Sequence, residues 1–249
     1  MGLVLLTALG VGGATAIGAI IGFIFKNFSH RFADIVLAFA SGVMLAAAVV
    51  GLILPSIDID NKFSVFITVL GIFVGAVVLG LIDKIIPHEH TLLTAEDNEN
   101  HTRLSRVILF VTAIAIHNFP EGIAAGVSFG TGNDMQALII AGGIALQNIP
   151  EGMVIIGPML SAGVKPKKTL FLALLTGLVE VVGTLVGYFA SSISAVVLPF
   201  ALAFAGGTML YVISHEMIPE THSHGSEKAA TFSLMIGFCI MLITDTFFG

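Results

Sequence analysis

The sequence predicts an all-α polytopic membrane protein with eight transmembrane helices in a 3+2+3 inverted-repeat arrangement. Of its 249 residues, 56% are hydrophobic and only 10% are charged, and the mean hydropathy is +1.03. A soluble domain carries roughly 25% charged residues, so this chain lacks the polar surface that water requires. Its apolar runs are apolar on all sides, which excludes an alternating β-barrel. The third observation is a pair of internal repeats.

The eight predicted spans are the apolar runs that polar segments separate. About 20 apolar residues suffice to cross a bilayer. Together they form one transmembrane domain over residues 1–249, with a His-rich segment at 84–104. The runs are residues 2–25, 32–54, 63–83, 105–130, 135–160, 168–191, 196–218 and 229–248.

The orientation follows from the basic residues, which concentrate in cytoplasmic connections. Nine of the ten Lys and Arg residues fall in or beside the connections after the first, third, fifth and seventh spans, and only Lys62 falls on the other side. We therefore expect a multi-pass protein of the cell membrane with both termini outside the cytoplasm. The net charge of −6 leaves no basic surface for a nucleic-acid partner.

The first internal repeat pairs the second span with the seventh. Phe39-Ala-Ser-Gly-Val-Met-Leu45 recurs as Phe204-Ala-Gly-Gly-Thr-Met-Leu210. Spans 1–3 then correspond to spans 6–8 and enter the membrane from the opposite side. Inverted repeats of this kind are common in secondary transporters, whose sites lie near the bilayer midplane.

Small residues also recur at close-packing spacing on several spans. Gly18 and Gly22 belong to such a stripe on the first span, and Gly183 and Gly187 to one on the sixth. Stripes of this kind let helix backbones approach closely, either within one protomer or between protomers.

The second repeat places polar residues inside the fourth and fifth spans. His117-Asn118-Phe119-Pro120-Glu121-Gly122 recurs as Gln147-Asn148-Ile149-Pro150-Glu151-Gly152. Residues four apart share one helix face, so His117 lies beside Glu121, and Gln147 beside Glu151. Each proline removes a backbone donor within this polar cluster. An ionisable side chain at mid-membrane costs about 2.5–3.5 kcal/mol, so these residues need a functional explanation.

A divalent cation fits this mixture of side chains. Carboxylate and amide oxygens suit many divalent ions, while imidazole favours zinc and iron-type metals over calcium. Two carboxylates offset the charge of one ion and reduce the cost of its burial. Further candidate ligands on other spans are Met44, Glu180, His215, Glu216 and Glu220.

Other interpretations stay open for several of these residues. The His117–Glu121 pair also suits a proton relay or a structural hydrogen bond, and Glu180 suits a structural or proton-coupling role. Met44 on an apolar helix also suits plain core packing. A zinc-protease helix is excluded, because His-Glu-x-x-His would need a second histidine where Pro219 stands. Paired carboxylates on facing helices leave an intramembrane di-metal carboxylate enzyme as the alternative function.

At these residues the sequence resembles the ZIP (Zrt/Irt-like protein) family of divalent metal transporters, in its bacterial, GufA-like branch. The resemblance implies a homodimer in the lipid bilayer, with a binuclear metal centre in each protomer and no cofactor beyond the transported ion. It implies no enzymatic activity. Its ligand positions match Met44, His117, Glu121, Gln147 and Glu151 for one metal, and Asn118, Asn148, Glu151 and Glu180 for a second, with Glu121 able to bridge.

The resemblance also implies import into the cytosol, with zinc foremost and iron, manganese, cobalt and cadmium as further candidate ions. His215 and Glu216 match the family's cytoplasmic exit region, and Glu220 follows them. Some relatives in this family carry His or Asp in the first two positions of the span-5 motif, where this chain has Gln147 and Asn148. Two neutral amides lower the negative charge, so we expect weaker binding of the second metal.

Overall fold

The computed structural model describes residues 1–25, 29–58, 63–85, 99–161, 163–193 and 197–248, and the regular elements in these ranges are helical. This confirms the all-α fold class. The elements are α1 (Gly2–Ile24), α2 (His30–Ala46), η1 (Ala47–Ile53), α3 (Leu54–Asp58), α4 (Ser64–Ile85), α5 (Glu99–Val127), η3 (Ser128–Thr131), α6 (Asp134–Ser161), α7 (Pro166–Ile193), α8 (Leu198–Val212), η4 (Ile213–Met217), α9 (Ile218–Thr221) and α10 (Glu227–Phe248).

Seven helical segments within the described residues are long and apolar enough to cross a membrane. Two of them are composite, because α2, η1 and α3 run on as one segment, as do α8, η4 and α9. The 29-residue α5 is a further long helix, and it carries Pro120 in its interior. Large apolar side chains cover the outside of the bundle, with Phe66 of α4 73% exposed and Phe232 of α10 66% exposed. Such a surface suits lipid rather than water.

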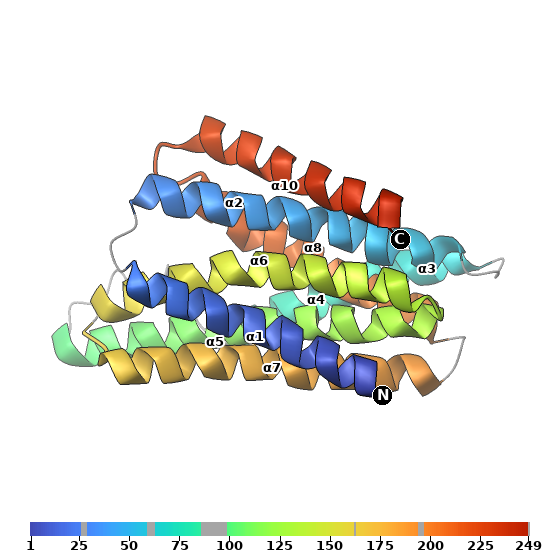
Figure 1. The fold of residues 1–249 in the computed structure, drawn as a ribbon, viewed down its shortest axis with the longest axis horizontal. Helices are drawn as coiled ribbons and strands as arrows, with labels where there is room; N and C mark the ends of the chain where they lie inside the picture. Colours follow the sequence, from blue (N-terminus) through green and yellow to red (C-terminus); the bar gives the residue numbers. More distant parts are fainter. Residues whose placement is uncertain (26–28, 59–62, 86–98, 162, 194–196, 249) are drawn as a thin grey trace.

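The long helices run along one axis, and both chain termini lie at the same end of the bundle (Figure 1). Successive long helices alternate in direction. The C-terminal ends of α1, α4 and α6 therefore lie at the end of the bundle opposite the chain termini. The described basic residues belong to helix ends or connections on that opposite side, as in Arg31, Lys84 and Lys228. Lys26 and Lys62 lie outside the described residues.

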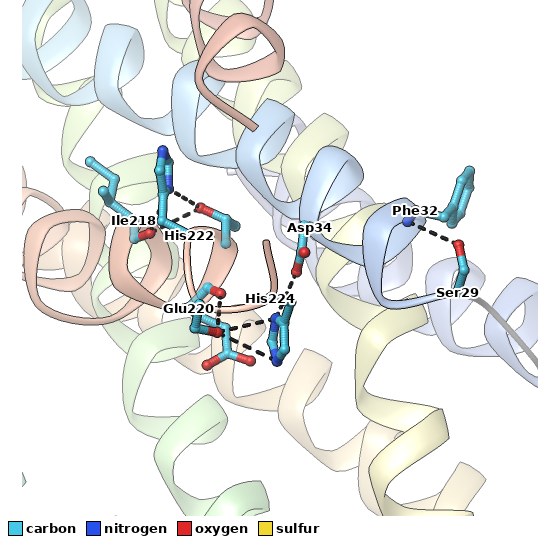
Figure 2. A network of polar contacts seen from close by, with 9 residues as sticks. Ser29, Phe32, Asp34, Ile218, Glu220, His222 and His224 are labelled. Atoms are coloured by element: carbon cyan, nitrogen blue, oxygen red, sulfur yellow. Dashed lines mark hydrogen bonds and ion pairs between the residues drawn. The ribbon is translucent and has the colours of Figure 1, made fainter. Parts of the chain in front are cut away.

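Local sequence signals explain where several helices begin. The Ser29 hydroxyl accepts a hydrogen bond from the Phe32 amide at 3.2 Å and caps α2 (Figure 2). Asn133 Oδ1 accepts from the amides of Met135 and Gln136, both at 3.1 Å, and caps α6. These side chains satisfy amide donors that have no partner in a helix's first turn.

Two π-helical turns interrupt the second and seventh spans. In η1 the Leu54 amide donates to the Val49 carbonyl, and in η4 the Ile218 amide donates to the Ile213 carbonyl. Each π-turn ends just before a proline, Pro55 or Pro219. A π-turn adds a residue to the helical turn and changes the direction in which nearby side chains point, which is why such turns often occur at functional sites.

Four close helix pairs build the bundle, namely α5 with α7, α1 with α6, α4 with α8 and α2 with α10, and α1 also packs against α7. The predicted repeat exchanges α1 with α7, α2 with α8, α4 with α10, and α5 with α6. This exchange converts the pair α5–α7 into α6–α1, and the pair α4–α8 into α10–α2. The 3+2+3 inverted repeat requires such an exchange, and we retain it as a prediction.

The predicted small-residue stripes pack within the protomer. A Cβ at Gly18 would overlap the carbonyl of Ile149 on α6, and one at Gly183 would overlap the carbonyl of Phe119 on α5. Gly12 of α1 and Gly177 of α7 face one another directly. The absence of side chains at these positions lets four helix backbones meet around the polar residues at the centre of the bundle.

Candidate metal centre

A carboxylate lies where α1, α5, α6 and α7 meet. Glu180 of α7 has no exposed surface. Its Oε1 accepts hydrogen bonds from Thr15 Oγ1 at 2.6 Å and from Asn118 Nδ2 at 2.5 Å, and its Oε2 accepts from Asn148 Nδ2 at 2.5 Å. Asn148 Nδ2 also lies 3.2 Å from the Val11 carbonyl oxygen. The structure thus brings together three of the predicted ligand residues, with Asn118 and Asn148 hydrogen-bonded to the carboxylate of Glu180.

Acceptor oxygens beside this network lack donors. Asn118 Oδ1, Asn148 Oδ1 and Glu121 Oε2 are buried, and none of them has a hydrogen-bond partner among the described residues. A buried oxygen without a donor costs free energy, about 1–3 kcal/mol when neutral and more when charged. A cation would satisfy such oxygens, so the donor set fits a positively charged ligand.

The second predicted group gathers around His117. Its Nε2 lies 2.8 Å from Glu216 Oε1, joining α5 to the π-turn η4. Glu151 lies within electrostatic reach of His117, Glu216 and Glu121. Gln147 lies beside Glu121. The two halves of the repeated motif therefore face each other, as their matching spacing predicts.

Within the described residues, no three His, Cys, Asp or Glu side chains come together closely enough to hold a metal ion by themselves. An ion bound here would need amide oxygens or a thioether as well, which are donors that the sequence supplies at Asn118, Gln147 and Met44. Met44 itself is completely buried in the apolar core, and so is Met209, its partner in the repeat.

The three predicted exit residues separate in the structure. Glu216 turns inward to His117, whereas His215 is exposed and its ring lies 5.1 Å from the ring of Tyr211. Glu220 is exposed at the end of α9. Glu216 therefore joins the group on α5 and α6.

The loop histidines at the end of α9 have local partners (Figure 2). His222 Nδ1 lies 2.9 Å from the Ile218 carbonyl oxygen, and its Nε2 lies 3.0 Å from Thr231 Oγ1. His224 Nδ1 lies 3.1 Å from Asp34 Oδ1, so this loop is attached to α2. The predicted His-rich segment 84–104 lies largely outside the described residues, which omit 86–98 and the side chains of 99–104.

Sequence reasoning did not identify Thr15 as part of the centre. A threonine in an apolar span carries no charge, so its presence alone does not indicate a functional residue. Thr15 is, however, 165 residues before Glu180, the same separation that relates Phe39 to Phe204. Extending the repeat to the first span would have placed Thr15 opposite Glu180.

The bundle and its centre define a multi-pass helical membrane protein with carboxylate, imidazole and amide groups buried among its spans. Such groups inside a membrane mark a pathway for ions or protons. The chain is also similar to known proteins. The sequence model of the family described as "ZIP Zinc transporter" matches residues 84–245.

Several curated relatives match over nearly the whole chain. The zinc transporter GufA of Myxococcus xanthus is 39% identical, with both chains covered completely. The zinc transporter ZIPB of Bordetella bronchiseptica is 37% identical over 95% of this chain and 78% of its own length. The zinc transporter ZIP11 of Xenopus tropicalis is 30% identical over 98% of this chain and 97% of its own length.

This chain belongs to the ZIP family. The resemblance inferred from the Pro-Glu-Gly motifs is thereby confirmed, and the bacterial relatives agree with the expected branch. ZIP proteins are transporters, and the alternative of an intramembrane di-metal carboxylate enzyme gains no support.

Proposed function

We propose that this protein imports divalent metal cations into the cytosol, with zinc as the principal cargo. The observation that carries the proposal is the buried group on α5 and α6, where Glu121 has an oxygen without a donor and lies beside Gln147 and Glu151. The names of its ZIP-family relatives support zinc as the cargo.

The cargo would be held in transit by Met44, His117, Glu121, Gln147 and Glu151. Glu121 and Glu151 would offset the charge of the ion. His117 would favour zinc and similar metals over calcium and magnesium, because imidazole is a poor ligand for hard cations. Iron, manganese, cobalt and cadmium are further candidate ions. A second ion at Asn118, Asn148, Glu151 and Glu180 remains the expectation of the resemblance.

Import requires no energy source other than the membrane potential. A divalent cation gains about 4.6 kcal/mol for each 100 mV of inside-negative potential, twice the figure for one charge. We further propose that the protein acts as a homodimer in the cell membrane with both termini outside the cytoplasm. The described basic residues at the end opposite the termini support this orientation.

Purified protein in liposomes that contain a trapped zinc indicator tests the proposal. We expect the wild type to take up zinc under an inside-negative potential, and both His117→Ala and Glu121→Ala to reduce the rate at least tenfold. Glu227→Gln provides a matched control, since it removes an exposed carboxylate at the start of α10. Zinc binding by the wild type without uptake would contradict transport.

A further inference from the structure

We propose that a cavity between α4, α5 and α8 is a binding site for one acyl chain of a membrane lipid. The cavity has a volume of about 330 Å³. On α5 its wall is a stripe that includes Ala115 and Phe119 but none of the proposed ion ligands. The inference therefore goes beyond the proposed function and does not depend on which ion is transported.

The wall of the cavity offers nothing that would hold water. Apart from Thr112 and Thr208, the side chains that line it are apolar. The Thr208 hydroxyl donates to the Ala205 carbonyl at 2.7 Å, and Thr112 also has an interaction partner. A buried water needs two to four polar partners, and an apolar cavity of about 150 Å³ stays dry and takes up benzene. The cavity thus suits an apolar occupant.

Helices α4 and α10 pack on their neighbours in the same way, which allows the two halves of the bundle to be compared. A Cβ at Gly75 of α4 would overlap the Phe204 carbonyl of α8, and a Cβ at Gly237 of α10 would overlap the Phe39 carbonyl of α2. Phe39 and Phe204 are the matching residues of the first internal repeat. Gly75 and Gly237 therefore hold matching places.

Four residues further along, the two halves differ in how their space is filled. Met241 of α10 extends to α6, where its Sδ lies 2.7 Å from the position that a Cβ would take at Gly143. Leu79 of α4 holds the matching place, and it lines the cavity instead of filling it. An unbranched apolar chain thus fills the space in one half. An acyl chain is also unbranched and apolar, so it suits the space left in the other half.

The cavity opens toward the surrounding lipid. Val78 lines it and is 38% exposed, and Val77 and Leu81 beside it on α4 are more than half exposed. Within the part of the chain that the structure describes, α4 makes few contacts with α5, whereas α10 packs against α6. Acyl chains surround a transmembrane bundle at this depth, so they are the apolar molecules that can enter between α4 and α5.

The bound chain would pack against the part of α5 that is interrupted by proline. Phe119 and Pro120 line the cavity, and Pro120 provides no backbone donor to its helix. Atoms that face a void have no contacts on that side, and an acyl chain restores those contacts. The lipid would thereby support α5 from the side that faces α4.

Photolabelling in liposomes tests the site. The probe is a phosphatidylcholine with a diazirine in one acyl chain, and mass spectrometry compares the labelling of residues 112–123 with that of the exposed face of α10. Ala115→Phe places a ring in the cavity, and we expect this ratio to fall at least fivefold. Leu178→Phe is the matched control, because Leu178 of α7 is 55% exposed and lies outside the cavity. Its ratio should stay within twofold of the wild type.

An unlabelled 112–123 segment in the wild type would overturn the inference, and so would an unchanged ratio in Ala115→Phe. If Ala115→Phe does not fold, Leu79→Met decides the question, since it gives α4 the side chain that α10 has at Met241 and nearly conserves volume. We expect the ratio to fall at least twofold in this variant, and an unchanged ratio contradicts the site. Photolabelling requires no transport, so a failure of zinc uptake would leave the result valid.

Discussion

Helices α1 and α7 make the same kind of backbone contact at the centre of the bundle but carry different side chains there. The carbonyl of Thr15 on α1 lies against Gly152, and the carbonyl of Glu180 on α7 lies against Gly122. Only the α7 side supplies a carboxyl group. The same contrast separates α5 and α6, where His117 corresponds to Gln147. Backbone packing in the two halves is matched, while the chemistry is divided unequally between them.

This difference shows that a matched backbone scaffold can carry unequal polar side chains in its two halves. Close packing demands glycine at the same places in both halves, because backbone meets backbone there. The polar side chains can differ between the two halves, because each needs only an interaction partner and not an identical residue in the other half.

The largest effect is expected where the scaffold is broken. Gly152→Ala places a Cβ onto the Thr15 carbonyl, and backbone cannot move aside as a flexible side chain can. We expect a loss of about 3 kcal/mol or more in the free energy of unfolding, at the upper end of overpacking costs. Gly157→Ala is the matched control on the same helix, since a Cβ there meets no atom within 4 Å. Thermal unfolding in detergent measures both, and equal stability of the two variants would contradict the packing argument.

A smaller effect is expected when α6 is given the same metal-binding side chain that α5 has at the matching position. Gln147→His gives α6 the imidazole that α5 has at His117, and imidazole is a better zinc ligand than an amide. We expect the Kd for zinc to fall about tenfold, which corresponds to about 1.4 kcal/mol. Gln136→His adds the same ring near the start of α6 and serves as the control. Isothermal titration with zinc measures the affinities, and a Kd at or above the wild-type value would count against Gln147 as a ligand position.

Glu216 provides a test of a contact outside the repeated motif. Glu216→Gln keeps the shape but removes the charge that faces His117 across 2.8 Å. We expect a three- to fivefold lower rate of zinc uptake, because hydrogen bonds to charged groups contribute about 1.5–3 kcal/mol and part of this bond survives in the amide. Glu227→Gln, which removes an exposed carboxylate at the start of α10, should transport normally. A rate unchanged in Glu216→Gln would remove Glu216 from the central group.

The smallest effect is expected near the N-terminal end of α2. His224→Ala removes the ring next to Asp34, whose carboxylate is buried while the histidine is about one third exposed. We expect a loss of about 0.5–1 kcal/mol in the free energy of unfolding, as for other partly exposed ion pairs. Lys228→Ala changes an exposed residue of the same region and should have no effect. Thermal unfolding compares the two variants, and a larger loss in Lys228→Ala would contradict the assignment.

Much of the fold and the centre could be predicted from the sequence. Apolar length and composition indicated the helices, because a span through lipid must satisfy its own backbone and remain apolar outside. The repeated Pro-Glu-Gly motifs indicated that α5 and α6 carry the polar centre, since charge in an apolar run is costly enough to be informative. The glycine stripes indicated close packing, and the structure places those contacts inside one protomer.

Other features left no comparable signal. Thr15 is uncharged and short, so only its correspondence with Glu180 distinguishes it from any threonine in a membrane helix. The inward direction of Glu216 depends on the π-turn η4, and an unbroken apolar pattern does not reveal where a helix adds a residue to one turn. In retrospect, Pro55 and Pro219 gave a hint, because each follows a π-turn. Amide orientation at Asn118 and Asn148 also depends on neighbours that only the folded bundle supplies.

The position of both chain ends at one end of the bundle has a practical consequence for labelling (Figure 1). A reporter fused to the first residue and a second reporter fused to the last residue will occupy the same aqueous compartment. Complementary halves of a split enzyme fused to the two ends should therefore reassemble, whereas a half inserted between α6 and α7 faces the other compartment. Such fusions make the sidedness of the protein readable in living cells.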